Sequence, residues 1–190
     1  TANANLPLDT GLKLGVSTIH REGDDPKGPW LPKIDELCRF VEFVDRAGFD
    51  SIWVGDHVSF PIPFLDPLLM LAQAAVASRR LTFGTGVYLL PLRHAWPAAK
   101  QVSTLDHVTE GRFIFGVGVG GEFPKEYELC GVPREERGAR LTEQLRAMRA
   151  LWTGEKVSFN GKHYGFADVE MRPPSRQLGG PPIWCGGRSA

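Results

Sequence analysis

Hydrophobic and polar positions follow two periods along the first two thirds of the chain. Between residues 32 and 48, apolar side chains recur at helical spacing before Gly48 ends the pattern, and these are Ile34, Leu37, Val41 and Val44. Runs typical of buried strands flank that helix and continue after it, starting at Leu12, Phe49, Leu81 and Arg112. Strands that alternate with single helices predict right-handed βαβ crossovers, and therefore a parallel sheet covered by helices.

The connecting helices carry their own start signals. Asp66 is placed as an N-cap, with Pro67 at the first helical position. Pro97 is expected to open the helix that ends near Gly111. Both signals support four successive strand-helix units.

The pattern changes after the fourth strand. A long helix is predicted from Glu135 to Thr153, and Asn160-Gly161 between two short alternating runs predicts a β-hairpin. The segment from Pro181 resumes as a fifth parallel strand. Two architectures fit: an open doubly wound sheet, or the first five strands of an eight-stranded (β/α)8 barrel, also called a TIM barrel. A barrel needs about 250 residues, so that alternative predicts a protein that continues past Ala190.

Composition narrows the class of protein without selecting an activity. The chain has 190 residues, 42% of them hydrophobic, which suffices for one globular domain with a substantial core. Its 22 Lys and Arg residues balance 22 Asp and Glu residues, so we expect no nucleic acid and no membrane surface as partner. Cys38, Cys130 and Cys185 lack CxxC spacing, which favours reduced thiols over a zinc site. The sequence shows no signal peptide or long apolar run, so we expect a cytoplasmic protein.

Candidate chemistry gathers where the predicted strands end, because ligands of parallel α/β folds bind at the carboxyl ends of the strands. Asp56 and His57 directly follow the second strand. An imidazole can donate or accept a proton at neutral pH, and a neighbouring carboxylate can fix its tautomer or raise its basicity. Gly55 can break the strand so that both side chains reach one pocket. The alternative is a loop histidine beside a satisfied carboxylate.

Glycine is frequent at the other strand ends, in the segments 84–86, 116–121 and 186–187. Repeated glycine suggests a flat or bulky ligand that the backbone approaches closely, although glycine also simply ends strands. The segment 116–121 contains GxGxxG, which raises a dinucleotide-binding alternative. That fingerprint belongs after the first strand of a βαβ unit, whereas here it follows the fourth and Pro124 interrupts the turn. An NAD-binding Rossmann dehydrogenase is therefore the less favoured interpretation.

Four segments in this order resemble the luciferase-like oxidoreductase family, the relatives of bacterial luciferase that use FMN or a deazaflavin coenzyme of the F420 type. They are GFDSIWVGDHV, LTFGTGVYLLPLRHAWPAAKQVSTLDHVTEGRFIFGVGVGGEF, GVPREERGARLTEQLRAMRALWTG and PPIWCGGRS. The resemblance runs from Leu12 to the last residue. It implies an oxidoreductase or monooxygenase that transfers a hydride or activates oxygen on a small organic substrate, and it implies a homodimer. A non-catalytic flavin-binding relative is the alternative, and His57 is the residue that distinguishes the two.

The resemblance also implies a domain layout. The chain would supply the first five strands of a TIM barrel as a single domain. Residues 12–121 would form four βα units, residues 122–180 an insertion region with the long helix and the hairpin, and residues 181–190 the fifth strand and the start of a phosphate-binding turn.

Individual site residues follow from the same resemblance. His57 would be the catalytic proton-transfer residue, with Asp56 beside it at the reactive edge of the cofactor. The Gly86-Val87 bond matches a non-proline cis peptide that props the ring system in many members. Further cofactor contacts fall on Val119 and Gly120 for the ring, and on Cys185, Gly186 and Gly187 for the phosphate. One departure is the Ala95-Trp96 pair between His94 and Pro97, where the family commonly has Pro directly after Arg-His.

Overall fold

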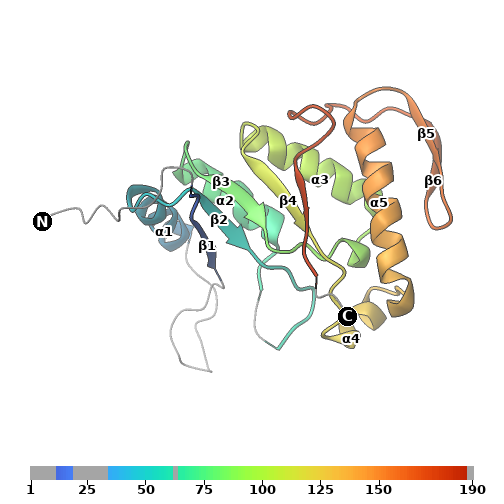
Figure 1. Cartoon of the computed structure of the whole chain (residues 1–190), viewed down its shortest axis with the longest axis horizontal. Helices are drawn as coiled ribbons and strands as arrows, with labels where there is room; N and C mark the ends of the chain where they lie inside the picture. Colours follow the sequence, from blue (N-terminus) through green and yellow to red (C-terminus); the bar gives the residue numbers. More distant parts are fainter. Residues whose placement is uncertain (1–11, 19–33, 62–63, 188–190) are drawn as a thin grey trace, which may run out of the picture.

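The computed structural model describes residues 12–18, 34–61 and 64–187 (Figure 1). Its centre is a five-stranded sheet whose strands lie side by side in chain order, and every neighbouring pair is parallel. The strands are β1 (Gly15–Thr18), β2 (Ser51–Val54), β3 (Thr82–Thr85), β4 (Phe113–Val117) and β7 (Ile183–Cys185). The predicted parallel sheet is therefore confirmed.

A layer of helices packs against this sheet (Figure 1). Helix α1 contacts α2, α2 contacts α3, and α3 contacts α5, so the layer is continuous. The long helices are α1 (Ile34–Arg46), α2 (Pro67–Ala77), α3 (Ala95–Val108) and α5 (Arg137–Trp152), and the short elements are α4 (Pro124–Leu129) and the 3-10 turns η1 (Leu90–Leu92) and η2 (Arg134–Glu136). Within the described ranges, no helix is both long and apolar enough to cross a bilayer.

The strand order distinguishes the two architectures that the sequence left open. In a doubly wound sheet the strand order reverses at a switch point, and helices cover both faces. Here the order is sequential without a reversal, which is the winding of a (β/α)8 barrel. The GxGxxG at residues 116–121 therefore follows a strand in the interior of a singly wound sheet, where a dinucleotide-binding crevice has no counterpart.

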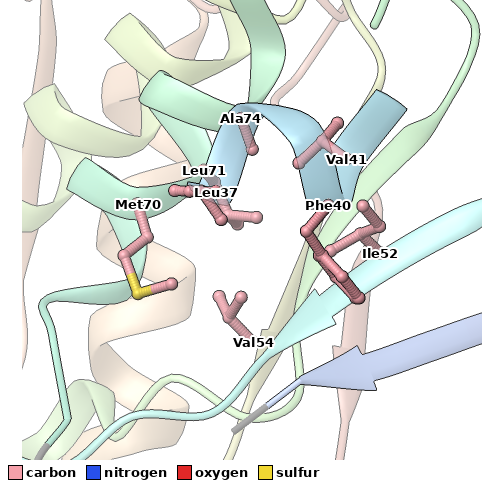
Figure 2. A pocket seen from close by; sticks show the side chains of 8 residues that line it. All are labelled: Leu37, Phe40, Val41, Ile52, Val54, Met70, Leu71 and Ala74. Carbon is pink, nitrogen blue, oxygen red and sulfur yellow. The ribbon is translucent and has the colours of Figure 1, made fainter. Parts of the chain in front are cut away.

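The main core lies between the sheet and the helices. Figure 2 shows one part of it, where Ile52 and Val54 of β2 face side chains from α1 and α2. They enclose a cavity of about 10 Å³. This volume is at the lower limit for a single water molecule, and an apolar site of that size stays dry. The cavity is a packing gap in the core and not a ligand site. Its other lining residues are Leu37, Phe40, Val41, Met70, Leu71 and Ala74.

The opposite face of the sheet carries two stacked tryptophans. Successive strand residues point to opposite faces, so Trp53 lies on the face away from Ile52 and Val54. Its indole stacks on Trp184 of β7, with ring centroids 5.0 Å apart and an interplanar angle of 22°. Gly84 lies under the Trp53 ring, where any side chain would collide with the indole. Strands β2 and β7 are three strand spacings apart, or roughly 14 Å, and a sheet curled toward this face allows the two rings to meet.

The helix starts were predicted with mixed success. Asp66 caps α2 as predicted, because its Oδ1 accepts hydrogen bonds from the N–H groups of Leu68 and Leu69. The prediction that Pro97 opens the next helix was wrong, since α3 begins at Ala95 and His94 is its N-cap. Proline lacks only an N–H that is unpaired anyway in the first helical turn, so Pro97 is tolerated two residues inside the helix.

The predicted hairpin forms after α5, from β5 (Val157–Asn160) and β6 (Gly165–Val169), which pair antiparallel. Four residues connect the strands, in place of the tight Asn160-Gly161 turn that the sequence indicated. The Glu143 carboxylate of α5 accepts hydrogen bonds from three N–H groups of this connection, those of Lys162, His163 and Tyr164. These bonds lower the pKa of Glu143, although burial opposes them. Helix α5 therefore organises the hairpin loop.

Candidate functional site

The predicted site residues lie where β2, β3, β4 and β7 end, and side-chain contacts join these ends to one another. Asp56 after β2 bonds to Leu89 after β3. Val87 after β3 lies against Gly118 after β4 and Gly186 after β7. The sheet thus brings together residues that are up to about 130 positions apart in the sequence.

Asp56 is buried and forms an ion pair with Arg93. Its carboxylate is bidentate: Arg93 Nη1 donates to Oδ2 at 2.5 Å, and Nη2 donates to Oδ1 at 2.6 Å. The Leu89 N–H also donates to Oδ2, at 2.8 Å. Because both carboxylate oxygens have protein donors and the side chain is inaccessible, Asp56 is built to hold Arg93 and the segment after β3. Asp56 therefore has no exposed carboxylate oxygen with which to make the predicted contact to the cofactor.

Burial and charge act in opposite directions on this pair. Burial raises the pKa of Asp56 above its usual range, and the Arg93 guanidinium and the Leu89 N–H oppose that effect. Burial acts to lower the pKa of Arg93, but the Asp56 charge and hydrogen bonds outweigh it and the pKa is raised. The guanidinium also lies 4.5 Å from the centroid of the buried Tyr88 ring. Arg93 therefore stays a cation inside the protein.

The carboxylate partner of His57 is Glu126 of α4 and not the adjacent Asp56. His57 Nδ1 lies 3.0 Å from Glu126 Oε2. Glu126 was not identified from the sequence, because this residue lies in a short segment, FPKEYELCGVP, that contains several charged residues. A signal was nevertheless present: Phe123, Glu126 and Tyr127 are spaced i, i+3, i+4, which places Glu126 on the apolar side of a short helix.

The Gly86-Val87 peptide is cis, as the resemblance implied. The Val87 side chain fits between two glycines. A Cβ atom at Gly118 would lie 2.5 Å from Val87 Cγ2, and one at Gly186 would lie 2.6 Å from Val87 Cγ1. A side chain at Gly116 would collide with the carbonyl oxygen of Thr85. Contacts within the protein therefore account for these glycines, whereas the sequence suggested a ligand as the reason. Gly86 and Gly187 differ, because they are exposed and no atom crowds them closely.

The glycine-rich loop after β4 is held by side chains from the segment that follows it. The Tyr127 hydroxyl donates to the Val119 carbonyl oxygen, and Arg134 Nη2 donates to the Gly121 carbonyl oxygen at 2.7 Å. Gly120 has φ +59° and packs on Leu89, so a larger residue there would be strained as well as crowded. The loop is therefore fixed before any ligand binds.

The predicted phosphate segment is only partly available. The Gly186 N–H donates to the Val117 carbonyl oxygen at 2.9 Å as part of the β4–β7 ladder, so it is already used. Gly187 is exposed, and a side chain at this position would meet open space. Cys185 is a free, exposed thiol, and Cys38 and Cys130 are also free. Of these main-chain groups, Gly187 best fits the predicted contact with a phosphate.

The accessible part of the site is weakly polar. Apart from the His57 ring, which is 19% exposed, it consists of the Gly86-Val87 backbone, Gly186, Gly187 and the Trp184 ring, whose exposed fraction is 56%. Such a surface suits a flat aromatic group, because backbone and ring faces can lie against it without a polar group being left unpaired. Among the described residues, no three His, Cys, Asp or Glu side chains are grouped to hold a metal ion.

The parallel sheet with its strands in chain order, the helix layer and the histidine at the strand ends define an α/β protein. Residues 12–190 match the model of the family described as luciferase-like monooxygenase, and the chain belongs to that family.

The chain is similar to three relatives that are named for different activities. The chain is 34% identical over 170 residues to 4-hydroxyprotoasukamycin monooxygenase of Streptomyces nodosus subsp. asukaensis, which covers 88% of this chain and 44% of the relative. It is 29% identical to the oxygenase component of the flavin-dependent trigonelline monooxygenase of Acinetobacter baylyi, covering 90% and 48%. It is 34% identical to the F420-dependent glucose-6-phosphate dehydrogenase of Beutenbergia cavernae, covering 72% and 42%.

The fold is similar to that of a solved relative, the monooxygenase RslO1 from Streptomyces bottropensis. The TM-score is 0.80 at 27% sequence identity, over 92% of this chain and 53% of that chain. The chain thus spans about half the length of the relatives that it matches.

Proposed function

We propose that the protein containing this chain is a flavin- or deazaflavin-dependent oxidoreductase that acts on a small organic substrate, either as a monooxygenase or as a dehydrogenase. The observation that carries the proposal is His57, a partly accessible imidazole at the end of β2 whose Nδ1 is held by a buried carboxylate. Family membership supports the redox class. A histidine fixed in this way can exchange a proton at its other ring nitrogen.

The proposed cofactor is FMN or a coenzyme of the F420 type, because a flavin-dependent relative and an F420-dependent relative match the chain at 29% and 34% identity. The bound cofactor would supply the hydride or electron chemistry. The residues proposed to hold its ring are Gly86, Val87, Val119 and Gly120, and Gly187 is proposed to approach the phosphate. Asp56 contributes indirectly, because it fixes Arg93 and the segment that carries Val87.

We also propose that the chain forms five of the eight strands of a TIM barrel, with residues 122–180 as an insertion. The sequential strand order and the tryptophan pair on the face of the sheet away from Ile52 and Val54 support this. The expected cytoplasmic location, and the absence of nucleic acid or membrane partners, stay predictions.

A homodimer is the proposed assembly. Leu69 and Val76 lie seven residues apart on one side of α2, with exposed fractions of 74% and 77%. An exposed apolar stripe of this kind supports burial against a second copy. A single-subunit mass for the full-length protein in light scattering would contradict the dimer.

Replacement of His57 by Asn tests the proposed activity. The Asn amide nitrogen can take the place of Nδ1 and still donate to Glu126, whereas Nε2 is lost. We expect the dissociation constant of FMN or F420 to change by less than about threefold, while the substrate-dependent half-reaction slows by about 10²- to 10⁴-fold. The measurement combines a cofactor titration with stopped-flow kinetics on the full-length protein.

His107→Asn is the control for this experiment, because His107 lies in the last turn of α3 and its ring Nε2 bonds to the Pro174 carbonyl oxygen. It should retain the wild-type rate. Full turnover in His57→Asn would make the histidine structural and assign the proton transfer to another group. A wild type that binds a cofactor but shows no substrate-dependent half-reaction would favour a non-catalytic flavin-binding protein. Failure of the wild type to bind either cofactor would contradict the proposed function as a whole.

A further inference from the structure

We propose that Glu126 is a positioning residue that holds His57 in one tautomer, with the proton on Nδ1 and Nε2 left for the reacting molecule. This inference rests on the proposed function, because His57 is the proton-transfer residue of that proposal.

The contacts of Glu126 use both of its oxygens. Its side chain is 2% exposed. Oε2 faces His57 Nδ1 at 3.0 Å, and Oε1 accepts from the N–H groups of Val58 at 2.7 Å and Ser59 at 3.1 Å. Burial of a carboxylate is costly unless hydrogen-bond donors replace water. The segment after β2 supplies all three donors, so Glu126 fixes the backbone after His57 as well as its ring.

These contacts determine the tautomer. Oε1 already accepts two backbone N–H bonds, and Oε2 is the oxygen that faces the ring. A charged carboxylate only accepts hydrogen bonds, so the group 3.0 Å from Oε2 must be an N–H. Neutral His57 therefore carries its proton on Nδ1, and the lone pair of the ring is on Nε2. In this state His57 can accept a proton from a substrate hydroxyl or from the reduced cofactor at Nε2, and can later return it.

Aromatic contacts fix the plane of the ring. Phe60 stacks on His57 with centroids 3.9 Å apart and an interplanar angle of 19°, and Phe64 meets the ring edge-on at 4.7 Å. Phe60 in turn contacts Phe123, which precedes α4. The carboxylate contact of His57 is made by Nδ1. His57 is thus held on this nitrogen and on its faces, and Nε2 is the nitrogen proposed to exchange the proton.

Helix α4 links the histidine to the glycine-rich loop. Glu126 reaches His57, and the next residue, Tyr127, donates to the Val119 carbonyl oxygen. Two neighbouring side chains therefore set the positions of a proposed proton-transfer group and a proposed ring contact. This arrangement is what a positioning element requires.

The first test is nuclear magnetic resonance of the histidine ring nitrogens in the full-length wild-type protein without cofactor. The ¹⁵N shifts and couplings distinguish the two tautomers directly, and the signal absent from His57→Asn identifies His57. We expect neutral His57 to be protonated on Nδ1. Neutral His57 protonated on Nε2, or an even mixture of both forms, would overturn the inference.

The second test is Glu126→Gln, which keeps the shape of the side chain. If the amide oxygen accepts from Val58 and Ser59, the amide NH₂ faces Nδ1 and forces the proton onto Nε2. We expect this switch in the ring signal. We also expect a half-reaction about 10- to 100-fold slower, with a cofactor dissociation constant within about twofold of wild type.

Glu128→Gln is the matched control, since Glu128 lies on the same helix with an exposed side chain. It should change neither the tautomer nor the rate. A folded Glu126→Gln protein with the wild-type tautomer and rate would contradict the inference. If that variant does not fold, the wild-type spectrum decides. If His57→Asn keeps full turnover, the proton-transfer role of His57 fails, while the spectrum still decides whether Glu126 sets the tautomer. Failure of the proposed function is a separate outcome, in which the wild type binds neither cofactor.

Discussion

At the scale of single residues, two buried carboxylates stand beside the strand ends and have different partners. Asp56 neutralises Arg93, and Glu126 bonds to His57. Adjacent residues of an extended segment point in opposite directions, so Asp56 and His57 diverge although they are neighbours in the chain. The acid-histidine pair of the sequence is thus two separate pairs in space.

Asp56→Asn should destabilise the protein, because it leaves the Arg93 charge in the interior without a counter-ion. Removing one partner of a buried pair costs about 3–5 kcal/mol. We expect a decrease of that size in the free energy of unfolding, measured by chemical denaturation of the full-length protein. Replacing both residues, as Asp56→Leu with Arg93→Met, should cost clearly less than Asp56→Asn alone.

A matched control is Asp35→Asn, which breaks an exposed i,i+4 pair with Arg39 on α1. Exposed pairs of this kind contribute about 0.5 kcal/mol or less. If Asp56→Asn were as mild as Asp35→Asn, the Asp56–Arg93 pair would not be the anchor that the geometry describes.

At the scale of elements, the glycines after the strands permit close packing of one connection against another. Val87, in the connection after β3, occupies the space between Gly118 and Gly186 at the ends of β4 and β7. The helices could be located from the period of their apolar residues, but contacts between two connections have no such period in the sequence. The contact of Val87 with the two glycines determines how closely the connection after β3 approaches the site.

Gly186→Ala should destabilise the protein, since the new Cβ would fall 2.6 Å from Val87 Cγ1. Overpacking of this kind costs about 1–3 kcal/mol. Val87→Ala in the same chain removes the colliding methyl group and should restore most of the lost stability. The measurement is chemical denaturation of the single and double variants.

Gly187→Ala is the control for the packing effect, because no atom lies within 4 Å of the position that the new Cβ would take. It should be close to wild type in stability. A double variant that is no more stable than Gly186→Ala would show that Val87 is not the obstructing group.

At the scale of the whole molecule, the sheet has one face covered by helices and another that carries the Trp53–Trp184 stack. Strand β7 pairs with β4 on one side. Its other edge is where the next strand of a barrel would pair. Hydrogen bonding along β7 alternates between these two edges, so individual amides report on each edge separately.

Hydrogen exchange of the full-length protein can therefore test the barrel. The Gly186 N–H bonds to β4, and by the two-residue period the Cys185 N–H faces the opposite edge. In a barrel both amides should be protected, with the Cys185 amide slowed on the order of 10²-fold or more relative to an unstructured peptide. Protection of Gly186 together with free exchange of Cys185 would favour an open sheet.

Much of the fold could be predicted from the sequence, because the signals concerned are local. The period of apolar residues distinguishes strands from helices, and the Asp66-Pro67 pair marks a helix start by capping chemistry that involves only its neighbours. The parallel direction of the strands followed from one repeated unit with right-handed crossovers, whereas their order in the sheet came from the structure. His57 was found by its place after the second strand and the cis Gly86-Val87 bond by resemblance, and the structure places both at the strand ends.

Only the tertiary structure decided the partners. Glu126 meets His57 across 69 residues, and Arg93 meets Asp56 across 37. These contacts depend on which way each segment leaves the sheet, which no short pattern encodes. Tertiary packing also decided that α3 starts at Ala95 and that the Gly186 N–H donates to the Val117 carbonyl oxygen of β4. The sequence by itself determined the elements and the chemistry available at their ends, and the packing of the crossovers determined which groups meet, because hydrogen bonds and burial act through space and not along the chain.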